Sequence, residues 1–146
     1  MKKILTVLVM LLMVASMANA SQVRKTLIAE TELNADPVAV EGSINIGSAD
    51  RVAFFVTYDE TETDGGLSVA VTMQISYDGT TWLAASFYDY AGGATLQTSE
   101  TISADGSYYC WFNPDMAIPQ VKLILTATGT DVDDTVDVIS YIVMDK

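Results

Sequence analysis

The chain has 146 residues and is strongly acidic, with nineteen Asp and Glu against seven Lys and Arg, a net charge of −12 and no histidine. This charge repels phosphate backbones and anionic lipids, so it argues against nucleic-acid partners and electrostatic membrane partners. Histidine is the commonest general base and metal ligand, and the chain also lacks a G-x-S-x-G nucleophile motif. We therefore expect no enzymatic activity.

Residues 1–20 have the three parts of a secretory signal peptide. Met1–Lys3 is basic, Ile4–Met17 is almost continuously apolar, and Ala18-Asn19-Ala20 has the small residues that precede a cleavage site. Because two of the seven basic residues lie in this segment, cleavage before Ser21 would leave 126 residues with a net charge of −14. The apolar run is shorter than the ~20 residues of a membrane helix. We expect no membrane span after cleavage, and a secreted, extracellular or cell-surface location.

Beyond residue 20, apolar and polar residues alternate with a period of two, which predicts strands. Glycine, proline and aspartate separate the alternating runs, as turns require. Gly42 is a candidate break within the second run. The predicted strands are Val23–Leu33, Val38–Ile46, Val52–Tyr58, Leu67–Tyr77, Trp82–Tyr88, Thr95–Ile102, Ser107–Phe112, Val121–Thr128 and Thr135–Met144.

This series of short strands without an amphipathic helix predicts an all-β fold, a single antiparallel β-sandwich. The pattern is compatible with both a jelly roll and an immunoglobulin-like Greek key. We divide the chain into the signal peptide at 1–20, an N-terminal strand-like segment at 21–36 and the β-sandwich domain at 37–146.

The most distinctive local motif is Ser76-Tyr77-Asp78-Gly79-Thr80-Thr81-Trp82. Its Asp-Gly pair predicts a tight hairpin, because both residues tolerate positive φ. The motif resembles the S-x-D-G-x-T-W hairpin of uncharacterised secreted or phage-associated β-sandwich proteins, of jelly-roll or discoidin-like type. The resemblance implies a structural hairpin and no binding residues.

Aromatic residues provide one candidate binding site. Within Tyr108–Phe112, alternate side chains must face opposite sides of a strand, so at least one pair of rings faces away from the home core. Such rings stack on sugars, and they also pack in cores or between subunits. The stacking candidates are Trp82, Tyr109 and Trp111.

Acidic loops provide a candidate metal site. Asp131, Asp133 and Asp134 cluster in one turn, and Ca²⁺ takes several carboxylate oxygens without strict geometry. The alternative is a solvated acidic loop that keeps the protein soluble. We predict no other cofactor. Cys110, the single cysteine, forms no internal disulfide and is expected to be a buried apolar residue rather than a nucleophile.

The two ends of the mature chain suggest assembly. Residues 21–33 form a strand-like segment before a turn signal, and such a segment either pairs with its own sheet or adds to a neighbouring copy. The last predicted strand is apolar on both faces, so one face needs cover unless a β-bulge switches the two faces. The assembly candidates are Val23, Arg24, Lys25, Leu27, Ile28, Leu33, Ile139, Tyr141 and Val143.

These patterns predict a non-catalytic, secreted structural protein that self-associates, as a subunit of an extracellular filament, surface layer or matrix. Its expected partner is another copy of itself. The first alternative is a carbohydrate-binding or adhesion module with an extracellular glycan as partner. The second alternative is a phage-type particle or fibre component.

Overall fold

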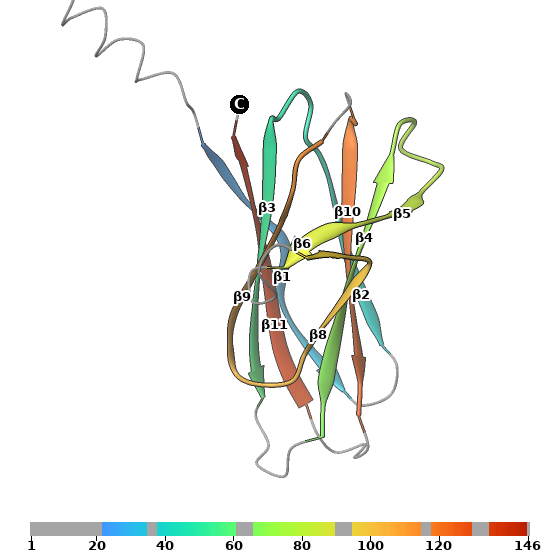
Figure 1. Ribbon diagram of the computed structural model, residues 1–146. Coiled ribbons are helices and arrows are strands. Elements are labelled where there is room, and N and C mark those ends of the chain that lie inside the picture. Colours follow the sequence, from blue (N-terminus) through green and yellow to red (C-terminus); the bar gives the residue numbers. More distant parts are fainter. Residues whose placement is uncertain are drawn as a thin grey trace, which may run out of the picture.

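The computed structural model describes residues 22–34, 38–60, 66–89, 95–114, 118–129 and 135–145. All regular structure in these ranges is β, arranged as two antiparallel sheets that face each other (Figure 1). The all-β sandwich prediction is confirmed. The strands are β1 (Val23–Asn34), β2 (Ala39–Asn45), β3 (Arg51–Glu60), β4 (Ser68–Ser76), β5 (Leu83–Ala85), β6 (Phe87–Asp89), β7 (Leu96–Gln97), β8 (Ser99–Ile102), β9 (Gly106–Phe112), β10 (Gln120–Thr128) and β11 (Thr135–Asp145).

The strand order distinguishes between the two topologies that the sequence allows. Sheet A has the order β1-β11-β3-β9-β6-β7, and sheet B has the order β2-β10-β4-β5, with β8 also paired to β4. The chain changes sheet at every step from β1 to β4 and again from β9 to β11. An immunoglobulin sandwich instead keeps its first two strands in one sheet. The observed order is that of a jelly roll.

The core lies between the two sheets because alternate side chains of each strand point inward. In β10 and β11 the buried and half-buried residues alternate almost without exception. Burying an aliphatic or aromatic side chain of this kind contributes about 1.5–3 kcal/mol relative to leaving it exposed. The largest fully buried side chains are Tyr58, Phe54, Phe87, Leu33, Ile46, Leu67, Met73, Ile102, Leu123, Leu125, Ile142 and Met144.

Two predicted strands are each divided between the sheets. In the run 82–88, β5 pairs with β4 in sheet B, and β6 pairs with β9 in sheet A after a step at Ser86. The run 95–102 divides in the same way at Thr98, with β7 in sheet A and β8 in sheet B. The prediction of single strands was wrong here, because alternation continues through a residue where the chain passes from one sheet to the other.

The strand β2 continues through Gly42, which the sequence marked as a candidate break. Gly42 lies against β1, where an added Cβ would collide with the backbone of Leu27 and lie 2.9 Å from Cγ1 of Ile28. Glycine is therefore required by close approach of two strands, and it does not interrupt the pairing of β2 with β10.

The segment Ser76–Trp82 connects β4 to β5 as predicted, but with a wider loop than a tight hairpin, because pairing resumes only at Ile75 and Leu83. Asp78 holds the loop: its Oδ1 accepts hydrogen bonds from the backbone N–H of Thr80 at 2.9 Å and of Thr81 at 2.7 Å. Gly79 has a φ of 75° and donates its N–H to Ser76 Oγ at 2.8 Å. The loop is thus a side-chain-capped turn.

The first strand belongs to the sandwich. β1 pairs with β11 from Val23 opposite Met144 to Asn34 opposite Thr135, with register shifts on either side of Ile28. Ile28 and Leu33 are 5% and 2% exposed. The segment 21–36 and the body 37–146, which the sequence analysis separated, therefore share one core. The signal peptide at 1–20 and the boundary at 35–37 lie outside the described residues.

Candidate functional site

The outward side of sheet A carries a group of aromatic and aliphatic side chains, which we call the aromatic face. Pairing of β11 with β3 places Tyr141 opposite Phe55, and pairing of β3 with β9 places Phe55 opposite Tyr109. Because their neighbours along each strand are buried, these side chains point away from the core. The aromatic face consists of Phe55, Tyr88, Tyr109, Trp111, Ile139, Tyr141 and Val143.

The rings of the aromatic face are held by contacts with one another. Phe55 and Tyr109 have ring centroids 5.1 Å apart, and Tyr88 stacks on Trp111 at 4.5 Å with an interplanar angle of 23°. Such pairs are worth about 0.5–1.5 kcal/mol beyond their buried area. These contacts restrict the orientations of the rings.

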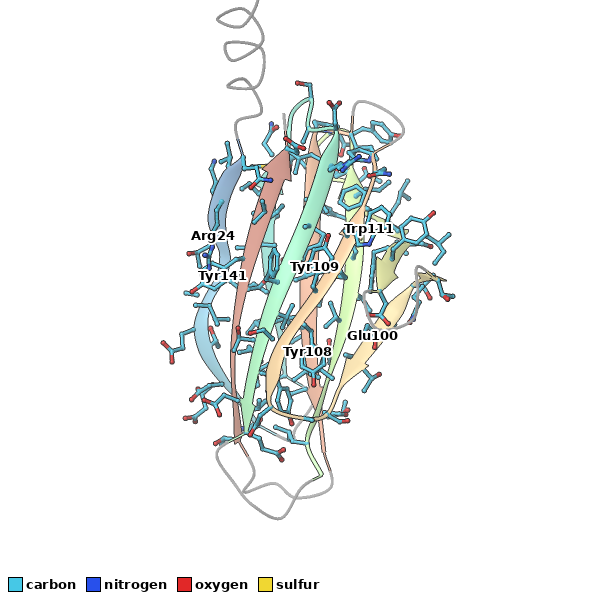
Figure 2. The ribbon with its side chains drawn as sticks, turned by 60° about the vertical axis from the view of Figure 1, so that its left-hand side comes forward. Arg24, Glu100, Tyr108, Tyr109, Trp111 and Tyr141 are labelled. Atoms are coloured by element: carbon cyan, nitrogen blue, oxygen red, sulfur yellow. The ribbon has the colours of Figure 1, made fainter. Side chains whose placement is uncertain are left out.

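Arg24 covers the ring of Tyr141. Its guanidinium carbon lies 4.2 Å from the ring centroid, which is the geometry of a cation–π contact. Figure 2 shows Arg24 and Tyr141 on the β1 side of sheet A, with Tyr109 in the middle and Trp111 on the far side. With Arg24, the aromatic face therefore extends across five paired strands, β1, β11, β3, β9 and β6.

An open hollow of about 1110 Å³ begins at one end of the aromatic face, beside Arg51 and Asp145, and extends past Phe55 to Ser107. Ala53 lies between Val143 and Trp111 in the strand register, and its small side chain leaves space between these larger neighbours. Phe55 and Tyr109 also line the hollow. The polar residues around it include Gln22, Arg51, Asn113 and Asp145.

Charge is distributed unevenly along the aromatic face. Arg24 and Arg51 lie at the end where the hollow begins, and Asp145 pairs with Arg51 in the strand register. At the opposite end of the same strands the register brings three carboxylates together, with both Glu32 and Asp59 opposite Asp137. We call these the basic end and the acidic end.

A second group of polar residues, on β6, β8 and β9, lines a smaller pocket that is also lined by Val56 and Val71. Asp89 and Cys110 are 8% and 6% exposed and are partners in the β6–β9 register. Burial, followed by the charges of Asp89 and Glu100, raises the pKa of the Cys110 thiol to about 12. The thiol is therefore protonated at neutral pH and does not provide a thiolate nucleophile.

The predicted stacking residues do not form one site. Tyr109 and Trp111 lie on the aromatic face, but Trp82 precedes β5 of sheet B. The ring of Trp82 lies 4.5 Å from Nζ of Lys122, which donates to both carboxylate oxygens of Glu41 at 3.1 Å. Trp82 therefore does not share a surface with Tyr109 and Trp111, because it precedes a strand of the opposite sheet.

The predicted assembly residues also separate. Ile28 and Leu33 are in the core, and Val23 and Leu27 pack partly against it. Arg24 and Lys25 are exposed on β1. The other three candidates, Ile139, Tyr141 and Val143, are half-buried on the aromatic face.

Phe55 and Tyr88 are members of the aromatic face that the sequence analysis did not select. The adjacent pair Phe54-Phe55 was a usable signal, because consecutive strand residues point to opposite sides. Phe54 is fully buried, whereas Phe55 is 38% exposed. Tyr88 could be assigned to this face only once β6 was seen to pair with β9.

The proposed calcium ligands Asp131, Asp133 and Asp134 lie outside the described residues. Within the described ranges, no three histidine, cysteine or carboxylate side chains are placed to share a metal ion. The same ranges contain no helix of the length and apolarity needed to cross a membrane.

Comparison with protein-family models and with curated proteins finds no match. Among solved structures, the infectious bursal disease virus VP2 subviral particle has a TM-score of 0.51 at 9% identity, covering 88% of this chain and 33% of that chain. The chain thus spans about a third of the length of VP2.

Two further structures are more distant. The disulfide-linked pili of Bacillus endospore appendages have a TM-score of 0.39 at 12% identity, covering 88% of this chain and 91% of that one. TmCBM61 in complex with β-1,4-galactotriose has a TM-score of 0.39 at 10% identity, with coverages of 86% and 70%. At these identities, similarity shows a shared fold alone, and the chain is similar to VP2 in that sense.

Proposed function

We propose that this protein is a non-catalytic extracellular structural subunit that self-associates, and that the aromatic face is its contact surface. The observation that carries the proposal is the aromatic face itself, an ordered set of rings and aliphatic side chains on the outside of a strongly acidic chain. Tyrosine, tryptophan and phenylalanine are the residues enriched in protein interfaces. The signal-peptide pattern at 1–20 supports the extracellular location.

A face contact fits the fold better than donation of β1 to a neighbour. β1 already pairs with β11, and its irregular register around Ile28 is the kind of bulge that hinders further strand pairing. On the opposite side of the sandwich, β7 has only two residues and β5 only three. β1, β5 and β7 are thus poor templates for strand addition, and the edge strand β2 lies against β1 at Gly42. The aromatic face, in contrast, is broad.

The test uses the protein beginning at Ser21. Sedimentation velocity over a concentration series should show material heavier than the monomer, and negative-stain microscopy should show whether it is a closed oligomer or a polymer. Phe55→Ser should shift the distribution toward the monomer, because it removes the central exposed ring. Leu83→Ser, which changes a 53% exposed leucine of sheet B, is the matched control and should leave the distribution unchanged.

The hollow beside Trp111 supports a second candidate, a glycan-binding module. It combines the aromatic side chains of Tyr109 and Trp111 with the polar groups of Arg51, Asn113 and Asp145. Rings of this kind pack against sugars while polar groups bind the hydroxyls. A strictly monomeric wild-type protein that binds a glycan array, and loses that binding in Trp111→Ala, would replace the assembly proposal.

A further inference from the structure

We propose that two copies pack with their aromatic faces together about a two-fold axis that runs across the strands, so that Arg51 of each copy meets Asp59 of the other. This inference rests on the proposed function and specifies its partner and its orientation. The orientation depends on how charge is placed along β3 and its neighbours.

Arg51 and Asp59 stand at opposite ends of one strand. Both are exposed and both alternate with the buried residues of β3, so they lie on the outward side with Phe55 midway between them. Eight residues of antiparallel strand span roughly 27 Å at about 3.4 Å per residue. The two charges are therefore too far apart to pair within one copy, and they flank the centre of the aromatic face symmetrically.

Neighbouring strands repeat this polarity. At the basic end, Arg24 of β1 adds a second guanidinium on the outward side, where Asp145 is the carboxylate in register with Arg51. At the acidic end, Glu32 and Asp137 add to Asp59. Arg24 and Arg51 are two of only five basic residues that remain after residues 1–20 are removed, so their position at one end of this face is a marked asymmetry.

A symmetric pair of identical faces has two simple orientations. When the two-fold axis runs along the strands, each end meets its own equivalent, and Arg51 opposes Arg51 while Asp59 opposes Asp59. When the axis runs across the strands through Phe55, each basic end meets the acidic end of the second copy. Like charges held opposite each other disfavour association, so the second orientation is selected.

The same arrangement accounts for association of a protein with a large negative charge. Copies repel one another at long range, and this repulsion is screened by salt within about 10 Å at 0.1 M. At contact, the crossed orientation places the guanidinium of Arg51 beside a carboxylate at both ends of the interface, while the rings of Phe55, Tyr109 and Tyr141 are removed from water. Apolar burial then provides affinity, and charge provides orientation.

The test is a charge exchange between Arg51 and Asp59, measured by sedimentation equilibrium on protein beginning at Ser21. Arg51→Glu alone and Asp59→Arg alone should each weaken self-association by about tenfold, because each single variant creates like-charge contacts at both ends of the dimer. An equimolar mixture of the two variants should associate as the wild type does, because the glutamate introduced in one copy then meets the arginine introduced in the other. The double variant, with both changes in one chain, should also self-associate as the wild type does.

Lys25→Glu is the matched control for Arg51→Glu. It changes the net charge by the same amount, but Lys25 pairs in register with the buried Ile142 and so does not share the outward side with Arg51. This variant should weaken association far less than Arg51→Glu. Circular dichroism of each variant should match the wild type, since all three side chains are exposed.

The outcomes separate the two proposals. Wild-type protein that stays monomeric at every concentration overturns the proposed function itself. Wild-type protein that associates, with no recovery in the mixture of Arg51→Glu and Asp59→Arg, overturns the crossed orientation alone. Tighter association in a mixture of wild type and Arg51→Glu than in either protein alone would also overturn it, in favour of the orientation in which Arg51 meets Arg51.

Discussion

Gly42 of β2 lies directly against Leu27 of β1, so that the two edge strands of opposite sheets touch through backbone atoms. A Cβ added to Gly42 would lie 2.8 Å from the carbonyl carbon of Leu27, closer than real Cβ contacts. The contact occurs where the register of β1 shifts, between Thr26 and Ile28. One side of the sandwich is therefore closed by a bend of β1 over β2.

Gly42→Ala should destabilise the fold by about 1–3 kcal/mol, the usual cost of forcing extra atoms into a packed site. Urea unfolding followed by circular dichroism would measure this difference. Ser43→Ala, at the neighbouring exposed position of β2, is the control and should have little effect. Equal stability of Gly42→Ala and wild type would mean that β1 does not approach β2 as closely as described.

Deletion of residues 22–34 should prevent folding of the domain. The deletion removes Ile28 and Leu33 from the core, at about 1.5–3 kcal/mol each, and leaves one edge of β11 unpaired. Loss of the β-type circular dichroism spectrum and of dispersed NMR signals would confirm this. A folded, soluble monomer after the deletion would show that β1 is dispensable, and would revive donation of this strand to a neighbouring copy.

Asp78 should make the fold sensitive to acid. Hydrogen bonds from the backbone N–H groups of Thr81 and Thr80, together with the Thr81 hydroxyl, lower the pKa of Asp78 well below its usual range. Because the pKa is lower in the folded state, the stabilisation is present above the ordinary aspartate pKa and is lost as the pH falls below it. Asp78→Asn keeps an acceptor oxygen but does not ionise.

Melting temperatures of wild type and Asp78→Asn, compared between pH 7 and pH 2, test this prediction. The acid-induced decrease should be smaller in the variant. If the melting temperatures of the two proteins fell equally between pH 7 and pH 2, the acid sensitivity would come from other carboxylates.

Glu100 should destabilise the fold at neutral pH, which is opposite to the effect of Asp78. Burial, followed by the charge of Asp89, raises the pKa of Glu100. A carboxyl whose folded-state pKa is raised destabilises the fold when it ionises, so this contribution to stability falls as the pH rises above the ordinary glutamate pKa. Glu100→Gln should therefore raise the midpoint of urea unfolding at pH 7 and leave it nearly unchanged at pH 3. A variant less stable than wild type at pH 7 would contradict this assignment.

The sequence was sufficient to predict the sandwich, because alternation with a period of two is the direct consequence of one buried face. The runs 52–58, 121–128 and 135–144 lie within β3, β10 and β11 of the structure. The same pattern does not reveal which sheet a residue belongs to. Trp82 and Trp111 looked equivalent in the sequence, yet Trp82 precedes a strand of sheet B and Trp111 lies in a strand of sheet A, since the chain crosses between the layers at Ser86.

The candidate site was predictable only in part. Tyr109 and Trp111 were recognised from alternation within one strand, and Tyr141 from a strand that is apolar on both sides. The opposition of a basic end and an acidic end depends on pairing between strands that are distant in the sequence. Arg51 and Asp59 belong to one strand, but Arg24, Glu32 and Asp137 join them only when β1 and β11 pair beside β3, and no local pattern specifies that order.

The place of β11 between β1 and β3 determines when this molecule can fold. Until β11 is available, β1 lacks its partner and β3 has one open edge, although both strands precede β11 by most of the chain. Contacts between such distant residues make folding slow. A nascent chain therefore cannot complete sheet A until its last strand arrives. For the exported subunit that we propose, this delay would keep the chain unfolded while it passes through a narrow secretion channel. Its core would then be buried only after export.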